Sequence, residues 1–228
     1  MSDAEKQFTA RRQRMVSQQI LARGLTDEAV LGALATVPRH RFVAPDYAEL
    51  AYEDMPLSIP AGQTISQPYI VAYMISLLRL QTSDRVLEVG TGSGYAAAVL
   101  SLLAREVYGV ERHEQLIRLA RQRLEEMEYD NVFLRQGDGT LGWPEHAPYD
   151  GILVSAGGPV VPEPLRAQLA IGGRLVMPVG RLPRYQDLIC LTRLSETDYL
   201  SEDMGAVAFV PLVGKAAWPS TAEKMEAD

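Results

Sequence analysis

The chain has 228 residues, of which 47% are apolar and 22% charged, a balance typical of an ordinary globular protein of one domain. Its net charge of -7 argues against nucleic acid as a dedicated partner, because phosphate binding needs basic surfaces. The apolar runs are too short to cross a membrane, and Met1–Lys6 lacks the pattern of a signal peptide. The single cysteine, Cys190, cannot form an internal disulfide, so we expect a cytoplasmic protein.

Residues 1–80 predict a helical preface, because no stretch in them alternates as a strand does. Residues 1–14 form a loosely helical start, and two further helical stretches end at Gly24 and Pro38, residue types typical of helix ends. Asp54–Pro68 contains three prolines, a glycine and small polar side chains, a composition that favours no regular element.

A buried helix over residues 69–80 follows the preface loop, and Pro68 suits its first turn. From Arg85 the pattern alternates strands and helices, which predicts an α/β fold with a doubly wound, mainly parallel sheet. We expect antiparallel strands at the end, an α/β core over residues 81–214 and a tail over residues 215–228, all in one domain. The predicted strands are 85–89, 107–111, 131–135, 151–156, 174–180, 187–194 and 206–212, and the predicted helices are 96–104, 116–127 and 162–169.

Three glycines at alternate positions follow the first of these strands and precede a strong helix-forming run. A strand, a glycine-rich turn and a helix N-terminus let a ligand approach bare backbone. The dinucleotide fingerprint would place its last glycine at residue 95, where this chain has Tyr95. With Glu88 before it, the glycine-rich loop (Gly90, Thr91, Gly92, Ser93 and Gly94) resembles the S-adenosylmethionine loop of doubly wound methyltransferases. The alternative is a tight turn that binds nothing.

Two more acidic residues follow predicted strands, at the edge where open α/β sheets bind ligands. Glu111 lies where such folds bind both ribose hydroxyls; its alternative is a helix-start carboxylate favoured by the helix dipole. By resemblance, Asp138 lies near the adenine amino group, and an Asx-turn is the alternative for it. Their occurrence together with Glu88 favours a ligand site.

Several blocks resemble the protein-L-isoaspartate O-methyltransferases and follow the order of that family from about residue 15 to 214. Gln63–Pro68 is the most specific, because methyltransferases of other families do not share it. At Ser155–Pro159 the chain departs from the run that is usual in the family on the substrate side. The other matching blocks are Val37–Arg39, Asp54–Gly62, Val86–Tyr95, Gly137–Gly139, Pro178–Gly180 and Phe209–Leu212.

The resemblance implies a Rossmann-like methyltransferase fold. It also implies methyl transfer from S-adenosylmethionine, leaving S-adenosylhomocysteine, to the free α-carboxylate of L-isoaspartyl residues, which starts repair through a succinimide. An ionised carboxylate is already a nucleophile, so we expect neither a metal nor a covalent intermediate. By resemblance Ser66 is the active-site residue, and the alternative is that it caps the helix at Pro68. The residues implied to bind the cofactor are Ile65, Gln67, Pro68, Glu88, Gly90, Thr91, Gly92, Ser93, Gly94, Glu111, Arg112, Asp138, Gly139 and Gln186.

Two other functions stay open from the sequence. A carboxyl O-methyltransferase acting on another peptide or a small acid would need only a different acceptor site, and the departure at Ser155–Pro159 leaves room for one. A binding scaffold without activity is disfavoured by the joint presence of Ser66, the glycine-rich loop and the three acids. We expect isoaspartyl proteins and peptides as substrates, no nucleic acid or membrane partner, and a monomer.

Overall fold

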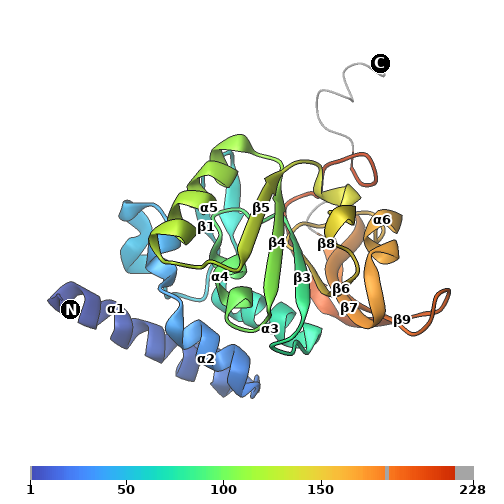
Figure 1. The fold of residues 1–228 in the computed structure, drawn as a ribbon. Helices are drawn as coiled ribbons and strands as arrows, with labels where there is room; N and C mark the ends of the chain where they lie inside the picture. The colour runs from blue at the N-terminus through green and yellow to red at the C-terminus, as the bar shows by residue number, and fades with distance from the viewer. Residues whose placement is uncertain (1, 183–184, 219–228) are drawn as a thin grey trace.

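The computed structural model describes residues 2–182 and 185–218, and a seven-stranded sheet lies at its centre (Figure 1). The strands of this sheet are β3 (Arg85–Val89), β4 (Glu106–Glu111), β5 (Val132–Gln136), β6 (Tyr149–Val154), β7 (Leu169–Leu182), β8 (Tyr185–Arg193) and β9 (Tyr199–Val207). Their order is β5-β4-β3-β6-β7-β8-β9. The pairs from β5 to β7 are parallel, whereas β8 pairs antiparallel with both β7 and β9. This confirms the predicted mainly parallel sheet and its antiparallel end.

The helices have clear sequence signals at their ends. They are α1 (Asp3–Arg14), α2 (Glu28–Thr36), α3 (Pro68–Leu78), α4 (Tyr95–Ser101), α5 (Glu114–Glu126) and α6 (Glu163–Ala167). The Ser2 side chain caps α1 by accepting from Glu5 N, so this start is more regular than the loosely helical one expected. Asp27 caps α2 in the same way, and the turns after α1 end at Gly24, with φ of 90°. No helix within the described ranges is long and apolar enough to cross a membrane.

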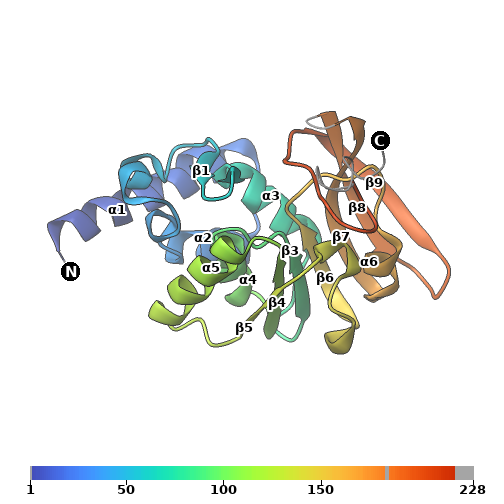
Figure 2. The same ribbon diagram turned by 90° about the horizontal axis from the view of Figure 1, so that it is seen from above.

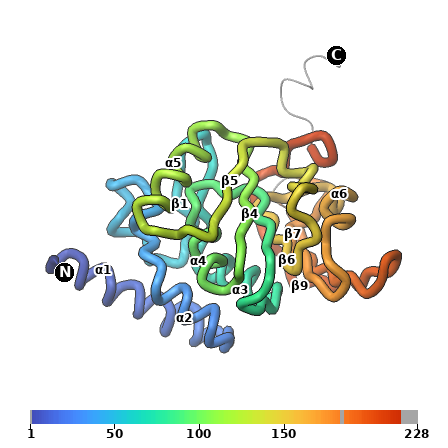
Figure 3. Tube along the Cα trace, viewed as in Figure 1, coloured from blue at the N-terminus to red at the C-terminus, as the bar shows by residue number. Residues whose placement is uncertain are grey.

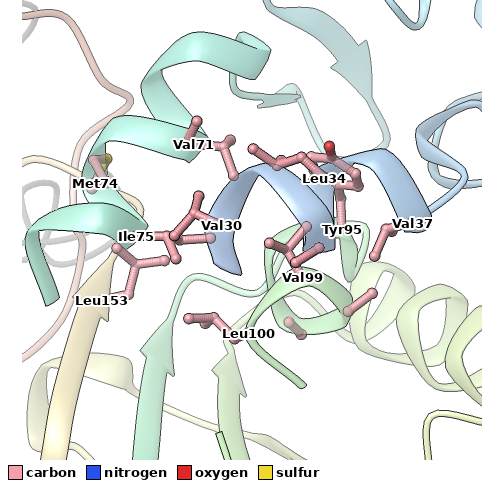
Figure 4. Packing of buried hydrophobic residues seen from close by; sticks show 14 of the residues in the cluster. Val30, Leu34, Val37, Val71, Met74, Ile75, Tyr95, Val99, Leu100 and Leu153 are labelled. Atoms are coloured by element: carbon pink, nitrogen blue, oxygen red, sulfur yellow. The ribbon is translucent and has the colours of Figure 1, made fainter. Parts of the chain in front are cut away.

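The two faces of the sheet carry separate apolar clusters, because successive strand residues point to opposite faces. Val86 and Val107 belong to the cluster that α2, α3 and α4 cover, and Leu87 and Tyr108 to the one that α6 covers. Figure 2 shows α6 on the side of the sheet away from the preface. In Figure 4, side chains of α2, α3 and α4 meet Leu153 of β6. The preface therefore packs onto the sheet, and β9 lies at the opposite end of the molecule (Figure 3).

The prediction that Asp54–Pro68 contains no regular element is wrong. β1 (Leu57–Ile59) and β2 (Gln63–Ile65) form an antiparallel hairpin there, and the chain reverses at Ala61 and Gly62, both with positive φ. The prolines and the polar residues hide a short alternation of buried and exposed side chains. The buried ones are Leu57, Ile59 and Ile65.

Element boundaries also differ in the second half of the chain. α6 ends before Leu169, which already belongs to β7. The strand expected at residues 206–212 is wrong, because β9 ends at Val207. Most β9 side chains are exposed, as on an edge strand, and its polar sequence hides it from a search for apolar runs. Residues 208–218, here called the C-terminal strap, leave the sheet. The predicted tail over residues 215–228 therefore begins within the strap, and its part from 219 to 228 lies outside the described residues.

Candidate active site

A cavity of about 990 Å³ lies at the carboxyl ends of β3, β4 and β6, the edge where the sequence predicts a ligand. Loops after these strands, the β1–β2 hairpin and the C-terminal strap line it. Ten predicted site residues are among the lining, namely Ile65, Ser66, Glu88, Gly90, Thr91, Gly92, Ser93, Glu111, Arg112 and Gly139. Gln67, Pro68, Gly94, Asp138 and Gln186 are outside it.

The glycine-rich loop turns sharply between β3 and α4. Gly92 and Gly94 have φ of 57° and 94°, in the left-handed region that side chains disfavour. A Cβ at Gly94 would also lie 3.3 Å from the Cβ of Ala120 on α5. The loop therefore needs glycine both for its turn and for its approach to α5, and it presents backbone to the cavity.

Glu111, at the end of β4, connects the loops after two neighbouring strands. It is 5% exposed, and its Oε2 accepts from Gly92 N at 2.9 Å while its Oε1 accepts from His113 N at 2.9 Å. His113 is the N-cap of α5, so the carboxylate does lie at a helix start, as the alternative for this residue states. It also lines the cavity, and a carboxylate has further lone pairs for a ligand.

Glu88 is the buried acid of the cavity. It is 1% exposed, and no partner for its Oε2 is found among the residues that the structure describes. The pKa of Glu88 is raised to about 8, chiefly by burial and also by the charge of Glu111, although the side chain of Thr91 lowers it. A buried carboxyl without a partner in a ligand-sized cavity fits the cationic end of a ligand, which would favour its ionised form.

Ser66 lies between β2 and α3, half-buried at the cavity wall. The helix cap that was the alternative role for Ser66 is provided by Asp54, whose Oδ1 accepts from Tyr69 N at 3.0 Å in the first turn of α3. Within the described part of the chain, no hydrogen bond of Ser66 Oγ is found. Ser66 therefore lines the cavity and does not cap α3.

Asp138 and Gln186 hold the C-terminal strap. Asp138 Oδ1 accepts from both Thr140 N and Thr140 Oγ1, the Asx-turn geometry that was its alternative, and its Oδ2 accepts from Lys215 N at 2.8 Å. Gln186 is 4% exposed; its Oε1 accepts from Phe209 N at 2.7 Å and its Nε2 donates to Phe209 O at 3.3 Å. Asp138 and Gln186, both predicted to bind the ligand, therefore hold the strap that lines the cavity, and neither is among the lining residues.

The strap was missed as a part of the cavity, as were the end of β7 and His113. From the strap, residues 208–213 and Trp218 line it, and from β7, Arg181 and Leu182. One signal was present in the sequence, since Phe209–Leu212 is among the blocks that resemble the family. The expectation of a strand there concealed its role.

The departure at Ser155–Pro159 has a structural explanation. Gly157 N donates to Val210 O at 2.8 Å, and Leu212 N donates to Gly157 O at 2.7 Å, so this loop anchors the strap. A Cβ on Gly157 would lie 2.5 Å from Gln186 Nε2, and one on Gly158 would lie 2.7 Å from Met177 Cε. Glycine at both positions lets the loop approach Gln186 and β7.

Comparisons with known proteins agree with this geometry. The model of the family described as protein-L-isoaspartate(D-aspartate) O-methyltransferase (PCMT) matches residues 10–217. The chain belongs to this family. A Pelobacter propionicus relative, named protein-L-isoaspartate O-methyltransferase 2, is 61% identical over 208 residues, covering 91% of this chain and 92% of the relative. A Geotalea uraniireducens relative, protein-L-isoaspartate O-methyltransferase 1, is 56% identical over 93% of this chain and 97% of its own.

Solved structures of the PCMT family share the architecture. A protein-L-isoaspartate O-methyltransferase structure has a TM-score of 0.82 and 29% identity, covering 90% of this chain and 67% of that chain. A structure from Plasmodium falciparum, in complex with S-adenosyl-L-homocysteine, has a TM-score of 0.77 and covers 89% of this chain and 98% of that chain. At 23% identity, the second likeness concerns the fold alone. Together they support the Rossmann-like methyltransferase fold.

Proposed function

We propose that this chain transfers a methyl group from S-adenosylmethionine to the free α-carboxylate of L-isoaspartyl residues in damaged proteins and peptides. The methyl ester then starts repair through a succinimide. The observation that carries the proposal is that Ser66, from the block most specific to the family, lines the same cavity as the glycine-rich loop and Glu111. Family membership over residues 10–217 supports the acceptor class.

The cofactor side of the proposal is the cavity wall formed by β3, β4 and their loops. S-adenosylmethionine, when bound, supplies a sulfonium methyl that is already activated for displacement. Glu88 offers a buried carboxyl to a cationic group, and Glu111 offers lone pairs to ribose hydroxyls. The residues we assign to this wall are Ile65, Gly90, Thr91, Gly92, Ser93, Arg112 and Gly139. Gln67, Pro68 and Gly94 are outside the lining, as are Asp138 and Gln186, which hold the strap.

The acceptor side is formed by Ser66 and the C-terminal strap. The Ser66 hydroxyl donates to the acceptor carboxylate and orients one oxygen toward the methyl group. Phe209 and Leu212, 8% and 5% exposed, offer apolar surface that removes water from that carboxylate. Because the acceptor is an anion near neutral pH, these residues need only position and desolvate it.

A pair of peptides tests this function. The two have the same sequence and differ only in an isoaspartyl or an aspartyl residue, and methyl transfer from S-adenosylmethionine is measured for each. We expect turnover of the isoaspartyl peptide and none above background for its partner. Equal turnover would favour the carboxyl O-methyltransferase with another acceptor, and cofactor binding without turnover would favour an inactive scaffold.

We further propose a monomer that acts in the cytoplasm on isoaspartyl proteins and peptides and has no nucleic acid partner. The net charge of -7 supports the last point, and the single Cys190 suits a reducing compartment. In this proposal residues 1–228 form one domain, because Met15 and Val30 of the preface share an apolar cluster with Val86 of the sheet.

A further inference from the structure

Arg39 is completely buried, and no ion pair of its guanidinium is found within the described ranges. It lies in the turn Arg39–Phe42 after α2, within the family block Val37–Arg39, and the proposed chemistry gives it no task. A buried charge without a counter-ion costs free energy unless other groups compensate it. Its contacts must therefore explain why a cation is placed there.

Two carbonyl groups accept from Arg39. Nε donates to Ala51 O at 2.7 Å, and Nη2 donates to Ser66 O at 2.7 Å. The guanidinium is a planar fork with fixed donor directions, so the two bonds set one carbonyl relative to the other. The carbonyl of Ser66 is joined to the same Cα as its hydroxyl-bearing side chain, and Arg39 thereby restrains the residue that faces the acceptor.

The same guanidinium also contacts the helix that follows the glycine-rich loop. Its central carbon lies 4.7 Å from the ring centroid of Tyr95, the first residue of α4. Burial raises the pKa of Tyr95 to about 12, so its hydroxyl is neutral and supplies no counter-charge. Tyr95 lines the cavity next to the loop, and Arg39 thus touches both the segment that carries Ser66 and the segment behind the loop.

We propose that Arg39 is a positioning residue, which holds Ser66 in register with the glycine-rich loop so that acceptor and methyl donor meet at bonding distance. The inference rests on the proposed function. An error of about 1 Å in such an alignment costs on the order of a hundredfold in rate. Substrate and cofactor need not touch Arg39 for this effect.

The test compares Arg39→Met and Arg39→Lys with a matched control, Arg123→Met. Arg123 donates to the Phe42 and Val43 carbonyls at 2.9 and 3.0 Å, so it also binds the preface through two carbonyls, but away from Ser66. We expect both Arg39 variants to lower kcat for an isoaspartyl peptide at least tenfold, with the Kd of S-adenosylmethionine within about twofold of wild type. The control should lower Tm and leave kcat within about twofold.

A double-mutant cycle with Ser66→Ala separates positioning from general damage. If Arg39 acts through Ser66, Arg39→Met should lower kcat less than about threefold in the Ser66→Ala background. The proposal is overturned if Arg39→Met lowers kcat as much in the Ser66→Ala background as in the wild type. It is also overturned if the Arg39 variants keep the wild-type kcat. If Arg39→Met does not fold, Arg39→Lys decides.

A Ser66→Ala variant with unchanged kcat also overturns the role of Arg39, while a wild-type preference for the isoaspartyl peptide would still uphold the proposed function. A wild-type protein without that preference rejects both.

Discussion

On the side of the cavity that we propose for the methyl donor, the glycine-rich loop and Glu111 follow two neighbouring parallel strands. They are joined by a hydrogen bond from the backbone N–H of Gly92 to the side-chain carboxylate of Glu111. On the acceptor side, the β1–β2 hairpin, the loop at Ser155–Pro159 and the C-terminal strap come from distant parts of the chain. Buried polar side chains, among them Arg39 and Gln186, hold those segments by their main chains.

The donor side follows from the order of the strands, whereas the acceptor side depends on a few hydrogen bonds between distant residues. Damage to the donor side should therefore appear in cofactor affinity, and damage to the acceptor side in kcat or in the KM of the peptide. Four substitutions test this division. A donor-side variant that changes only kcat or KM, or an acceptor-side variant that changes only cofactor affinity, would contradict it.

The largest effect is expected for Glu111→Gln. One amide NH₂ must face either Gly92 N or His113 N, which leaves a buried donor without an acceptor at a cost of roughly 1–3 kcal/mol. That cost lowers the stability of the free and the bound protein alike. We expect the Kd of S-adenosylmethionine, measured by calorimetry, to rise about a hundredfold for another reason: the ribose hydroxyls lose a charged acceptor, whose hydrogen bond contributes roughly 1.5–3 kcal/mol. Glu114→Gln, exposed on α5, is the control, and a change below about threefold in Glu111→Gln contradicts the donor role.

Ser66→Ala comes next and probes the acceptor side. We expect the variant to keep the fold, because Asp54 caps α3, and to lose the hydroxyl that we propose orients the acceptor. We expect kcat to fall by more than about tenfold at saturating cofactor, while the Kd of S-adenosylmethionine stays within about twofold. Ser58→Ala, at an exposed position of the β1–β2 hairpin that precedes Ser66, should behave as wild type. Unchanged turnover in Ser66→Ala would remove the proposed role.

The pH dependence of cofactor affinity tests the role of Glu88 on the donor side. Its pKa of about 8 means that the free protein holds a proton there near neutral pH, and a bound cation favours the proton's release. Affinity should rise about tenfold between pH 6 and 7.5, where the ammonium of the ligand stays protonated, and Glu88→Gln should abolish this rise.

Glu88 should also affect the stability of the free protein. The ordinary pKa of a glutamate is 4.5, and that of Glu88 in the folded protein is about 8. Between these two pH values the folded state therefore binds a proton that the unfolded state has released. The Glu88 contribution to the free energy of unfolding is therefore present at low pH and is lost as the pH rises through that window. As the pH rises from 4.5 to about 8, the Tm of Glu88→Gln should fall less than the Tm of the wild type. Equal falls in Tm would mean that Glu88 keeps its ordinary pKa.

The smallest effect is expected for Gln186→Leu. It removes both bonds to the Phe209 main chain and loosens the strap without touching the cavity. We expect the KM of an isoaspartyl peptide to rise severalfold and Tm to fall by a few degrees, with cofactor affinity little changed. Asp187→Asn, at an exposed neighbouring position, is the matched control. A defect confined to cofactor affinity would place Gln186 on the donor side.

Sequence patterns could predict the donor side because its signals are local: a strand, alternating glycines and acids at strand ends. The resemblance pointed to Ser66, but residue types could not show that Pro56 and Pro60 flank the first strand of a hairpin. The resemblance placed Asp138 and Gln186 at the ligand, and residue types could not show that each has a hydrogen-bond partner in the strap, 77 and 23 residues away. A hydrogen bond over such a separation leaves no periodic trace in the sequence.

The hydrogen bonds of Asp138 have a consequence for the ageing of the protein itself. An aspartate followed by glycine is open to attack by the next backbone nitrogen on its side-chain carboxyl, because glycine brings no Cβ into the path. Asp138 precedes Gly139, but its carboxylate is engaged by two hydrogen bonds from Thr140 and one from Lys215. An Asp–Gly pair is a sequence from which isoaspartate forms. A protein proposed to act on isoaspartate thus restrains such an aspartate beside its own candidate active site.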